Sequence, residues 1–178
     1  MIMDRPGSQY IFVYSRESLN DSSDRASYIA YRDKRLTNKE YLEHWGKWVH
    51  LDDKENIHDL ARKLDLYVEE GTIPCVKFDR APQQWADMDQ CVLCVYCDDR
   101  QRDEVFEILS GMGVKIKAWT YDREVVEKWM PGGQYLERWI TANGLKKEEA
   151  DRTREESRQK FKAAFFDKPD EPCQGWIQ

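Results

Sequence analysis

Alternating lysine and aromatic residues near the middle of the sequence indicate a strand that could bind a ligand. In the segment VKIKAWTY, residues 114–121, every second side chain is basic or aromatic, whereas Val114, Ile116 and Ala118 fall between them. Because alternate side chains of a strand point to the same face, we expect the apolar set to pack against helices and the other set to lie on an open face. That outward set is Lys115, Lys117, Trp119 and Tyr121.

Two other predicted strands, residues 47–51 and 73–78, are expected to add side chains to the same open face. These side chains are Trp48, His50, Cys75 and Lys77. Rings that stack on a base, beside lysines that hold a phosphate, suit a nucleotide or the end of a single-stranded RNA. Trp48 and Trp119 would stack, and the lysines would contact the phosphate. The alternative is that the C-terminal helices cover this face, so that the tryptophans pack against Trp129, Tyr135 or Trp139.

An enzyme would need a proton acceptor and a proton donor on this face. His50 and Lys77 could abstract a proton and protonate a leaving group, as a lyase requires. The sequence contains no Ser-His-Asp order, no glycine-rich phosphate loop and no pair of histidines at helical spacing. A lone histidine is more often structural than catalytic, so binding is the preferred interpretation over catalysis.

Three cysteines follow the spacing C-x2-C-x2-C, which on paper fits an iron–sulfur or zinc site. They lie in CVLCVYC, an apolar run that predicts a central strand. Cys94 would then point away from Cys91 and Cys97, and those two would be about 20 Å apart at roughly 3.3 Å per residue. We therefore predict buried free thiols, with no metal and no cofactor.

The composition excludes some classes of protein. The 178 residues carry a net charge of −6, which disfavours generic polyanion binding. No apolar run is long enough for a membrane span, and MIMDRPGSQY at the N-terminus is unlike a signal peptide. These features, with an odd number of cysteines, predict a cytoplasmic protein without disulfide bonds.

The predicted elements between residues 47 and 121 follow the order β-α-β-β-α-β. Two such interleaved units form one antiparallel sheet with both helices on one face. We expect strand 114–121 beside strand 47–51, followed by 91–97 and 73–78, with N-terminal strands such as 9–14 extending that edge. The predicted core includes Leu60, Leu64, Val95, Val105, Leu109 and Ile116.

The flanking segments complete the predicted fold, an α+β domain with a helical C-terminal extension. Thr37-Asn38-Lys39-Glu40 is a capping box that predicts a helix over residues 38–44. Helices are also expected over residues 122–130, 134–143 and 145–166. We divide the chain into a domain at residues 1–144 and a charged extension at 145–178. The charged helix favours a solvated face and leaves a protein-interaction module as a further possible function.

Several short motifs between Gly46 and Asp122 resemble one known family. The motifs are Gly46-Lys47-Trp48, Glu70-Gly71, Lys77, Val95-Tyr96 and Tyr121-Asp122. This pattern resembles the basophilic-leukaemia-expressed protein family, whose fold is similar to that of the cap-binding translation initiation factor. Some members of that family carry the label phosphothreonine lyase, so the resemblance implies a lyase-like enzyme as an alternative function. The chain departs from the pattern at Tyr121, where the resemblance implies a lysine.

Overall fold

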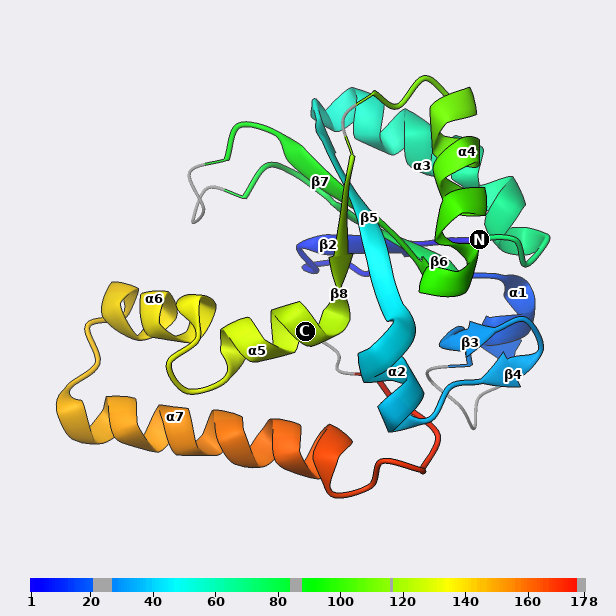
Figure 1. Cartoon of the computed structure of the whole chain (residues 1–178). Helices are drawn as coiled ribbons and strands as arrows, with labels where there is room; N and C mark the ends of the chain where they lie inside the picture. The colour runs from blue at the N-terminus through cyan, green and yellow to red at the C-terminus, as the bar shows by residue number, and fades with distance from the viewer. Residues whose placement is uncertain (21–26, 84–87, 116, 176–178) are drawn as a thin grey trace.

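Six antiparallel strands form the sheet around which the chain is arranged, in the order β1-β2-β6-β7-β5-β8 (Figure 1). The computed structural model describes residues 1–20, 27–83, 88–115 and 117–175. The strands are β1 (Ile2–Met3), β2 (Tyr10–Val13), β5 (Trp45–Asp52), β6 (Cys75–Asp79), β7 (Cys91–Asp98) and β8 (Ala118–Tyr121). This order confirms the predicted arrangement, with the N-terminal strands extending one edge.

Two helices, α3 (Lys54–Glu69) and α4 (Arg102–Gly111), pack on one face of the sheet. The apolar side chains of α3 recur every three or four residues, so they form one stripe along the helix. The five buried members of this stripe, which include the predicted core residues Leu60 and Leu64, are Ile57, Leu60, Ala61, Leu64 and Val68. They share one core cluster with Val76 and Val95 of the sheet and with Val105 and Leu109 of α4. The predicted core member Ile116 lies outside the described residues.

A second apolar cluster lies on the opposite face of the sheet. Tyr96 of β7 belongs to it, whereas the adjacent Val95 belongs to the first cluster. The helices on this side are α2 (Asn38–His44), α5 (Asp122–Trp129), α6 (Gln134–Ala142), α7 (Lys147–Phe161) and the π-helical turn η3 (Lys162–Phe166). Figure 1 shows α5, α6 and α7 grouped away from α3 and α4. The chain is therefore an α+β fold in which helices flank both faces of the sheet.

The predicted capping box starts α2 at its expected residue. The Thr37 hydroxyl accepts a hydrogen bond from the Glu40 amide at 3.2 Å, and the Glu40 carboxylate accepts one from the Thr37 amide at 2.9 Å. Both amides would otherwise lack an intrahelical partner. The helix ends at His44, and β5 follows with Trp45 buried in the second cluster.

The C-terminal segment returns to the start of α2 and forms a strap over it. The Asn38 amide donates to the Glu171 carbonyl and its side chain to the Lys168 carbonyl, at 2.9 and 2.8 Å. The Cys173 amide donates to the Leu36 carbonyl at 2.8 Å. Because Phe161, Phe165 and Cys173 are all in the second cluster, residues beyond 144 complete the core around α2.

The strand predicted over residues 114–121 is shorter than expected. The Val114 amide donates to the Leu109 carbonyl at 3.0 Å and so closes the end of α4, and β8 begins only at Ala118. Val114, Lys115 and Lys117 therefore precede the strand and are not part of it.

Near the N-terminus, the short helix α1 (Arg16–Asn20) follows β2. The short strands β3 (Ala30–Tyr31) and β4 (Lys34–Arg35) pair with each other in a separate two-stranded sheet. None of the helices within the described ranges combines the length and apolar character needed to cross a membrane.

Candidate functional site

The two tryptophans predicted to face outward lie on the sheet face that α3 and α4 cover, called here the helix-covered face. Trp48 pairs directly with Val95 of β7 and with Trp119 of β8. The Trp48 indole donates to the Arg102 carbonyl at 3.0 Å, and its ring lies 5.1 Å from Phe106 of α4. The prediction of an open face at Trp48 and Trp119 is therefore wrong, and α4, not a C-terminal helix, covers them.

The glycine that precedes the Lys47-Trp48 pair provides room for this packing. A Cβ atom on Gly46 would come within 2.5 Å of a Trp119 ring carbon and 2.8 Å of the Thr120 carbonyl oxygen. Such contacts are far closer than side chains tolerate, so the Trp119 ring lies over β5 only because residue 46 has no side chain.

His50 and Lys77 do not form the predicted acid–base pair. His50 is on the helix-covered face, with its Nε2 atom 3.6 Å from Asp52. Lys77 pairs with Cys94, on the other face of the sheet. A single substrate could not contact both side chains across the sheet, so the proposed pairing is wrong.

The remaining three predicted residues are also separated from Lys77. Lys117 lies before β8, donates to the Val114 carbonyl at 2.9 Å and sits 4.0 Å from the centre of the Phe106 ring. Tyr121 donates to Asp99 at 3.1 Å, and Lys115 is exposed. Of the seven predicted side chains, only Lys77 lies on the face opposite α3 and α4.

That opposite face carries a different polar set, which we call the lysine–tyrosine face. It consists of Tyr10, Lys47, Lys77, Cys94 and Tyr96. Direct strand pairing places Lys77 beside Cys94 and Lys47 beside Tyr96. These residues lie on the central strands and on the adjoining β2, yet the lysines, Cys94 and both tyrosines keep partial exposure.

Lys47 is held by a buried carboxylate at the start of α5. Its ammonium group donates to Asp122 Oδ1 at 2.7 Å, and the Tyr41 hydroxyl donates to Oδ2 at 2.6 Å. The ammonium group also lies 5.0 Å from the centre of the Tyr96 ring. Burial alone lowers the pKa of Lys47, but the nearby Asp122 outweighs that effect, so the pKa is raised. Lys47 is therefore a fixed positive charge whose side chain is only 13 % exposed.

Lys77 has the opposite shift. Its ammonium group lies 3.7 Å from the centre of the Tyr10 ring, a cation–π contact. Burial lowers the pKa of Lys77, and the positive charge of Lys47 lowers it further. Two amines on one face thus differ: Lys47 is kept charged, whereas Lys77 gives up its proton more readily than an ordinary lysine.

Cys94 lies between the two lysines. Burial raises the pKa of its thiol, while Lys47 and Lys77 oppose that rise. Cys91 and Cys97 are buried on the helix-covered face, so the predicted alternation of the three cysteines is confirmed. The three thiols cannot converge on one ion, and all five cysteines are free.

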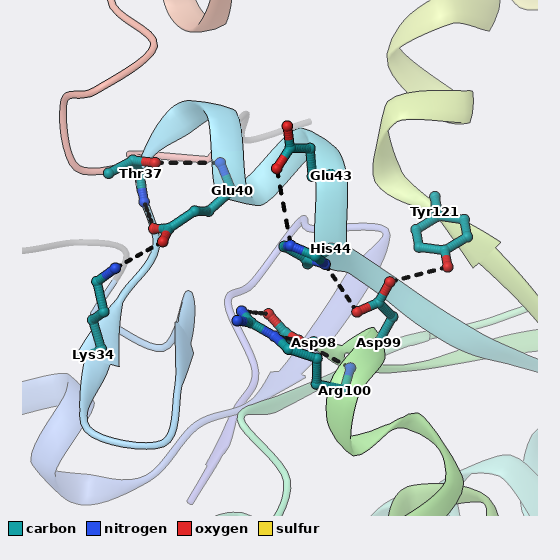
Figure 2. Close-up of polar contacts among 9 residues, drawn as sticks. All are labelled: Lys34, Thr37, Glu40, Glu43, His44, Asp98, Asp99, Arg100 and Tyr121. Atoms are coloured by element: carbon teal, nitrogen blue, oxygen red, sulfur yellow. Dashed lines mark hydrogen bonds and ion pairs between the residues drawn. The ribbon is translucent and has the colours of Figure 1, made fainter.

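A second polar cluster joins α2, β7 and β8 (Figure 2). His44 Nδ1 is 3.0 Å from Asp99 Oδ1. Asp98 accepts hydrogen bonds from the Arg100 amide at 3.0 Å and from its guanidinium group at 2.7 Å. His44, Asp98 and Asp99 have the chemistry of metal ligands, but a cation here would meet the guanidinium that already occupies Asp98. The cluster instead connects the end of α2 to the start of α4.

Comparison with family models, curated proteins and solved structures finds no match to this chain. The candidate site therefore depends on the geometry alone. Sequence reasoning missed Tyr10, Lys47, Tyr96 and Asp122 as members of one site. The alternation in β6, where Lys77 lies between the apolar Val76 and Phe78, correctly placed Lys77 on the face opposite α3.

Proposed function

We propose that the lysine–tyrosine face binds a phosphate-bearing ligand, either a nucleotide or the end of a single-stranded RNA. The observation that carries the proposal is the pair Lys47 and Lys77, whose ammonium groups lie beside the Tyr96 and Tyr10 rings on one sheet face. Lys47 is ion-paired with Asp122, and Lys77 lies against the Tyr10 ring at a partly exposed position.

The energetic cost of this arrangement supports a functional role. Lysines are rarely covered unless they are paired, and burial disfavours their charged form. An apolar side chain at residue 77 would avoid that cost. Shifted pKa values gathered on one surface are typical of functional sites, and Lys47 and Lys77 are shifted in opposite directions.

Each side chain has a distinct role in the proposal. Lys47, fixed by Asp122, and Lys77 contact the phosphate, because an ammonium group is a compact donor for phosphate oxygens. Tyr10, on β2 towards the sheet edge, offers a ring face for a base. The resemblance of residues 46–122 to the family with a cap-binding-like fold agrees with a nucleotide ligand and is itself part of the proposal.

Calorimetric titration tests the proposal directly. ATP and a short RNA with a 5′ phosphate are titrated into the wild type and into Lys77→Met. Loss of one charge-assisted contact should weaken binding roughly 10-fold or more. The matched control is Lys115→Met, which removes an exposed lysine elsewhere and should leave affinity unchanged. Equal affinity of the wild type and Lys77→Met, or an equal loss in both variants, would refute the site.

The lowered pKa of Lys77 favours a second candidate function, an enzyme of the phosphothreonine-lyase class. Neutral Lys77 would take the α-proton of a phosphothreonine residue as the phosphate leaves, and the charged Lys47 would hold that phosphate. His50 has no part in this scheme because it lies on the other face. Phosphate release from a phosphothreonine peptide by the wild type, lost in Lys77→Met and retained in His50→Ala, would establish the enzyme.

A protein partner at α7 also stays a prediction. The apolar side chains Ala150 and Phe161 are buried within the molecule, so such a partner would meet charged residues such as Glu155 and Arg158. A pull-down with a variant that reverses these charges would test it.

A further inference from the structure

A small cavity lies on the helix-covered side of the sheet, between α3 and the edge formed by β1, β2 and β6. Its volume is about 330 Å³, which is at the lower end of the range for small-molecule sites. The lining residues are Ile2, Asp4, Ile11, Lys54, His58, Arg62, Phe78 and Arg80. Since Ile11 and Phe78 belong to the core under α3, this cavity and the lysine–tyrosine face are on opposite sides of the sheet.

The wall formed by α3 is basic. Lys54, His58 and Arg62 are spaced four residues apart, so they follow one another along a single face of the helix. Lys54 is also the first helical residue, where the partial positive charge of the helix terminus adds to that of the side chain. An anion in the cavity would therefore meet several sources of positive potential in an otherwise acidic chain.

The two arginines differ in how readily they could reach a ligand. The Arg80 guanidinium donates to Asp4 and to the Ser8 and Arg5 carbonyls, so its position is fixed. Its positive charge offsets the negative charge of Asp4, the acidic residue in the lining. Arg62 is paired with Asp59 one turn earlier on α3, and both side chains are 64 % exposed. Exposed ion pairs of this kind are weak, so an anion could recruit Arg62 at little cost.

The floor of the cavity is apolar. Ile11 and Phe78 form a direct cross-strand pair on β2 and β6, and Ile2 is 38 % exposed at the edge. The His58 ring meets Phe78 edge to face at 5.0 Å, and its Nε2 atom lies 3.2 Å from the Asp79 carbonyl. These contacts fix His58 as a rigid wall between the apolar floor and the basic residues of α3.

We propose that this cavity binds a small phosphate monoester with an apolar body. The phosphate would contact Lys54 and Arg62, and the aryl or alkyl group would lie against Ile2 and the floor. Arginine is suited to this contact because its planar donors match two phosphate oxygens at once. The inference does not depend on the lysine–tyrosine face, which would bind its own ligand with different residues.

Calorimetry with phenyl phosphate and with inorganic phosphate tests this site on the whole chain. Phenyl phosphate should bind the wild type more tightly than inorganic phosphate, because only the ester contacts the floor. Arg62→Ala should weaken the binding of phenyl phosphate roughly 10-fold or more, and Lys54→Ala should weaken it by a smaller factor. The matched control is Lys63→Ala, which removes an exposed lysine of α3 that does not line the cavity.

Three results would overturn the inference. They are the absence of phenyl phosphate binding, equal affinity for the two phosphates, and equal effects of Arg62→Ala and Lys63→Ala. Lys77→Met separates the two sites: it should leave phenyl phosphate affinity unchanged, and a loss there would assign the ligand to the lysine–tyrosine face instead. Because Arg62 and Lys54 are exposed, melting curves of their variants should match the wild type and so exclude misfolding.

Discussion

The two faces of the sheet differ in what their side chains contact. On the helix-covered face, Leu93, Val95 and Val105 are fully buried in one apolar cluster, and even Trp48 and Trp119 pack against α4. On the lysine–tyrosine face, the same strands carry Lys47, Lys77 and Cys94 under partial cover. Packing explains the residue types on the first face, whereas at residues 47 and 77 of the second face packing alone would favour apolar side chains.

This difference distinguishes the side chains that stabilise the sheet from those of the proposed binding site. Apolar burial on the helix side stabilises the sheet, at about 25 cal/mol per Å² of apolar surface. The opposite side bears groups that cost stability unless they are paired. Variants that change one face at a time can therefore test this difference between the two faces.

The largest effect is expected from Asp122→Ala. This change leaves the Lys47 ammonium group and the Tyr41 hydroxyl without their shared acceptor. Removal of one partner from a buried ion pair costs about 3–5 kcal/mol, to be measured by urea unfolding. Asp59→Ala, at an exposed ion pair, should cost less than about 1 kcal/mol. Similar losses in both variants would show that the polar network is not buried as described.

Trp119→Ala should cost about 2–4 kcal/mol of unfolding free energy, because the ring packs on Trp48 and Tyr121. Ligand binding should be unchanged. The indole Nε1 atom is buried without a hydrogen-bond partner among the described residues, so Trp119→Phe should lose no hydrogen bond and cost much less. Weakened nucleotide binding with an unchanged melting temperature would instead restore the outward face predicted for Trp119.

Lys77→Met should raise the melting temperature by a few °C, since about 1 kcal/mol corresponds to roughly 2–4 °C in a chain of this size. The folded-state pKa of Lys77 lies below the unfolded value, so the unfolded chain binds more protons and wild-type stability rises with pH in that window. The advantage of Lys77→Met should thus be largest below the folded-state pKa of Lys77 and shrink as pH approaches the unfolded value of about 10.4. The measurement is urea unfolding of the wild type and Lys77→Met at pH 7 and pH 10. If Lys77 were not covered, the difference in unfolding free energy between the two proteins would be the same at both pH values.

Glu40 gives the smallest expected effect and serves as a reference outside both faces. Hydrogen bonds from Lys34 and from the Thr37 amide lower the pKa of Glu40 to about 2. Its stabilising contribution is present above the unfolded value of about 4.3 and is lost as pH falls towards 2. Glu40→Gln should therefore lose less stability than the wild type between pH 4.5 and pH 2. Identical acid unfolding curves for the two proteins would contradict the assignment.

Local hydrogen bonding explains which parts of the fold could be predicted from the sequence. The first residue of α2 was predicted from four residues, because the Thr37–Glu40 capping box is complete within them. The predicted core residues Leu60 and Leu64 are both in the buried stripe of α3, whose members recur at helical spacing. The strand order followed from the β-α-β-β-α-β sequence of elements, which allows few ways of pairing strands.

Assignment of the faces failed because it depends on strand register. A shift of one residue moves every side chain of a strand to the other face. The run Cys91–Cys97 is apolar on both sides and gives no indication of which side the helices cover. Lysines next to tryptophans looked solvent-facing, yet Trp119 fills the space left by Gly46, and Lys117 reaches back to the end of α4.

The strap formed by the C-terminal segment has a consequence for the order of events during synthesis. The Asn38 side chain is bonded to the Lys168 carbonyl, 130 residues later in the chain. At about 5–20 residues per second, the ribosome needs roughly 7–26 s to cover that distance. Tyr41 and Trp45 emerge early but obtain their partners Phe161 and Phe165 only after that delay. During this interval the two rings lack the C-terminal part of their cluster, and transiently exposed apolar side chains are what chaperones bind.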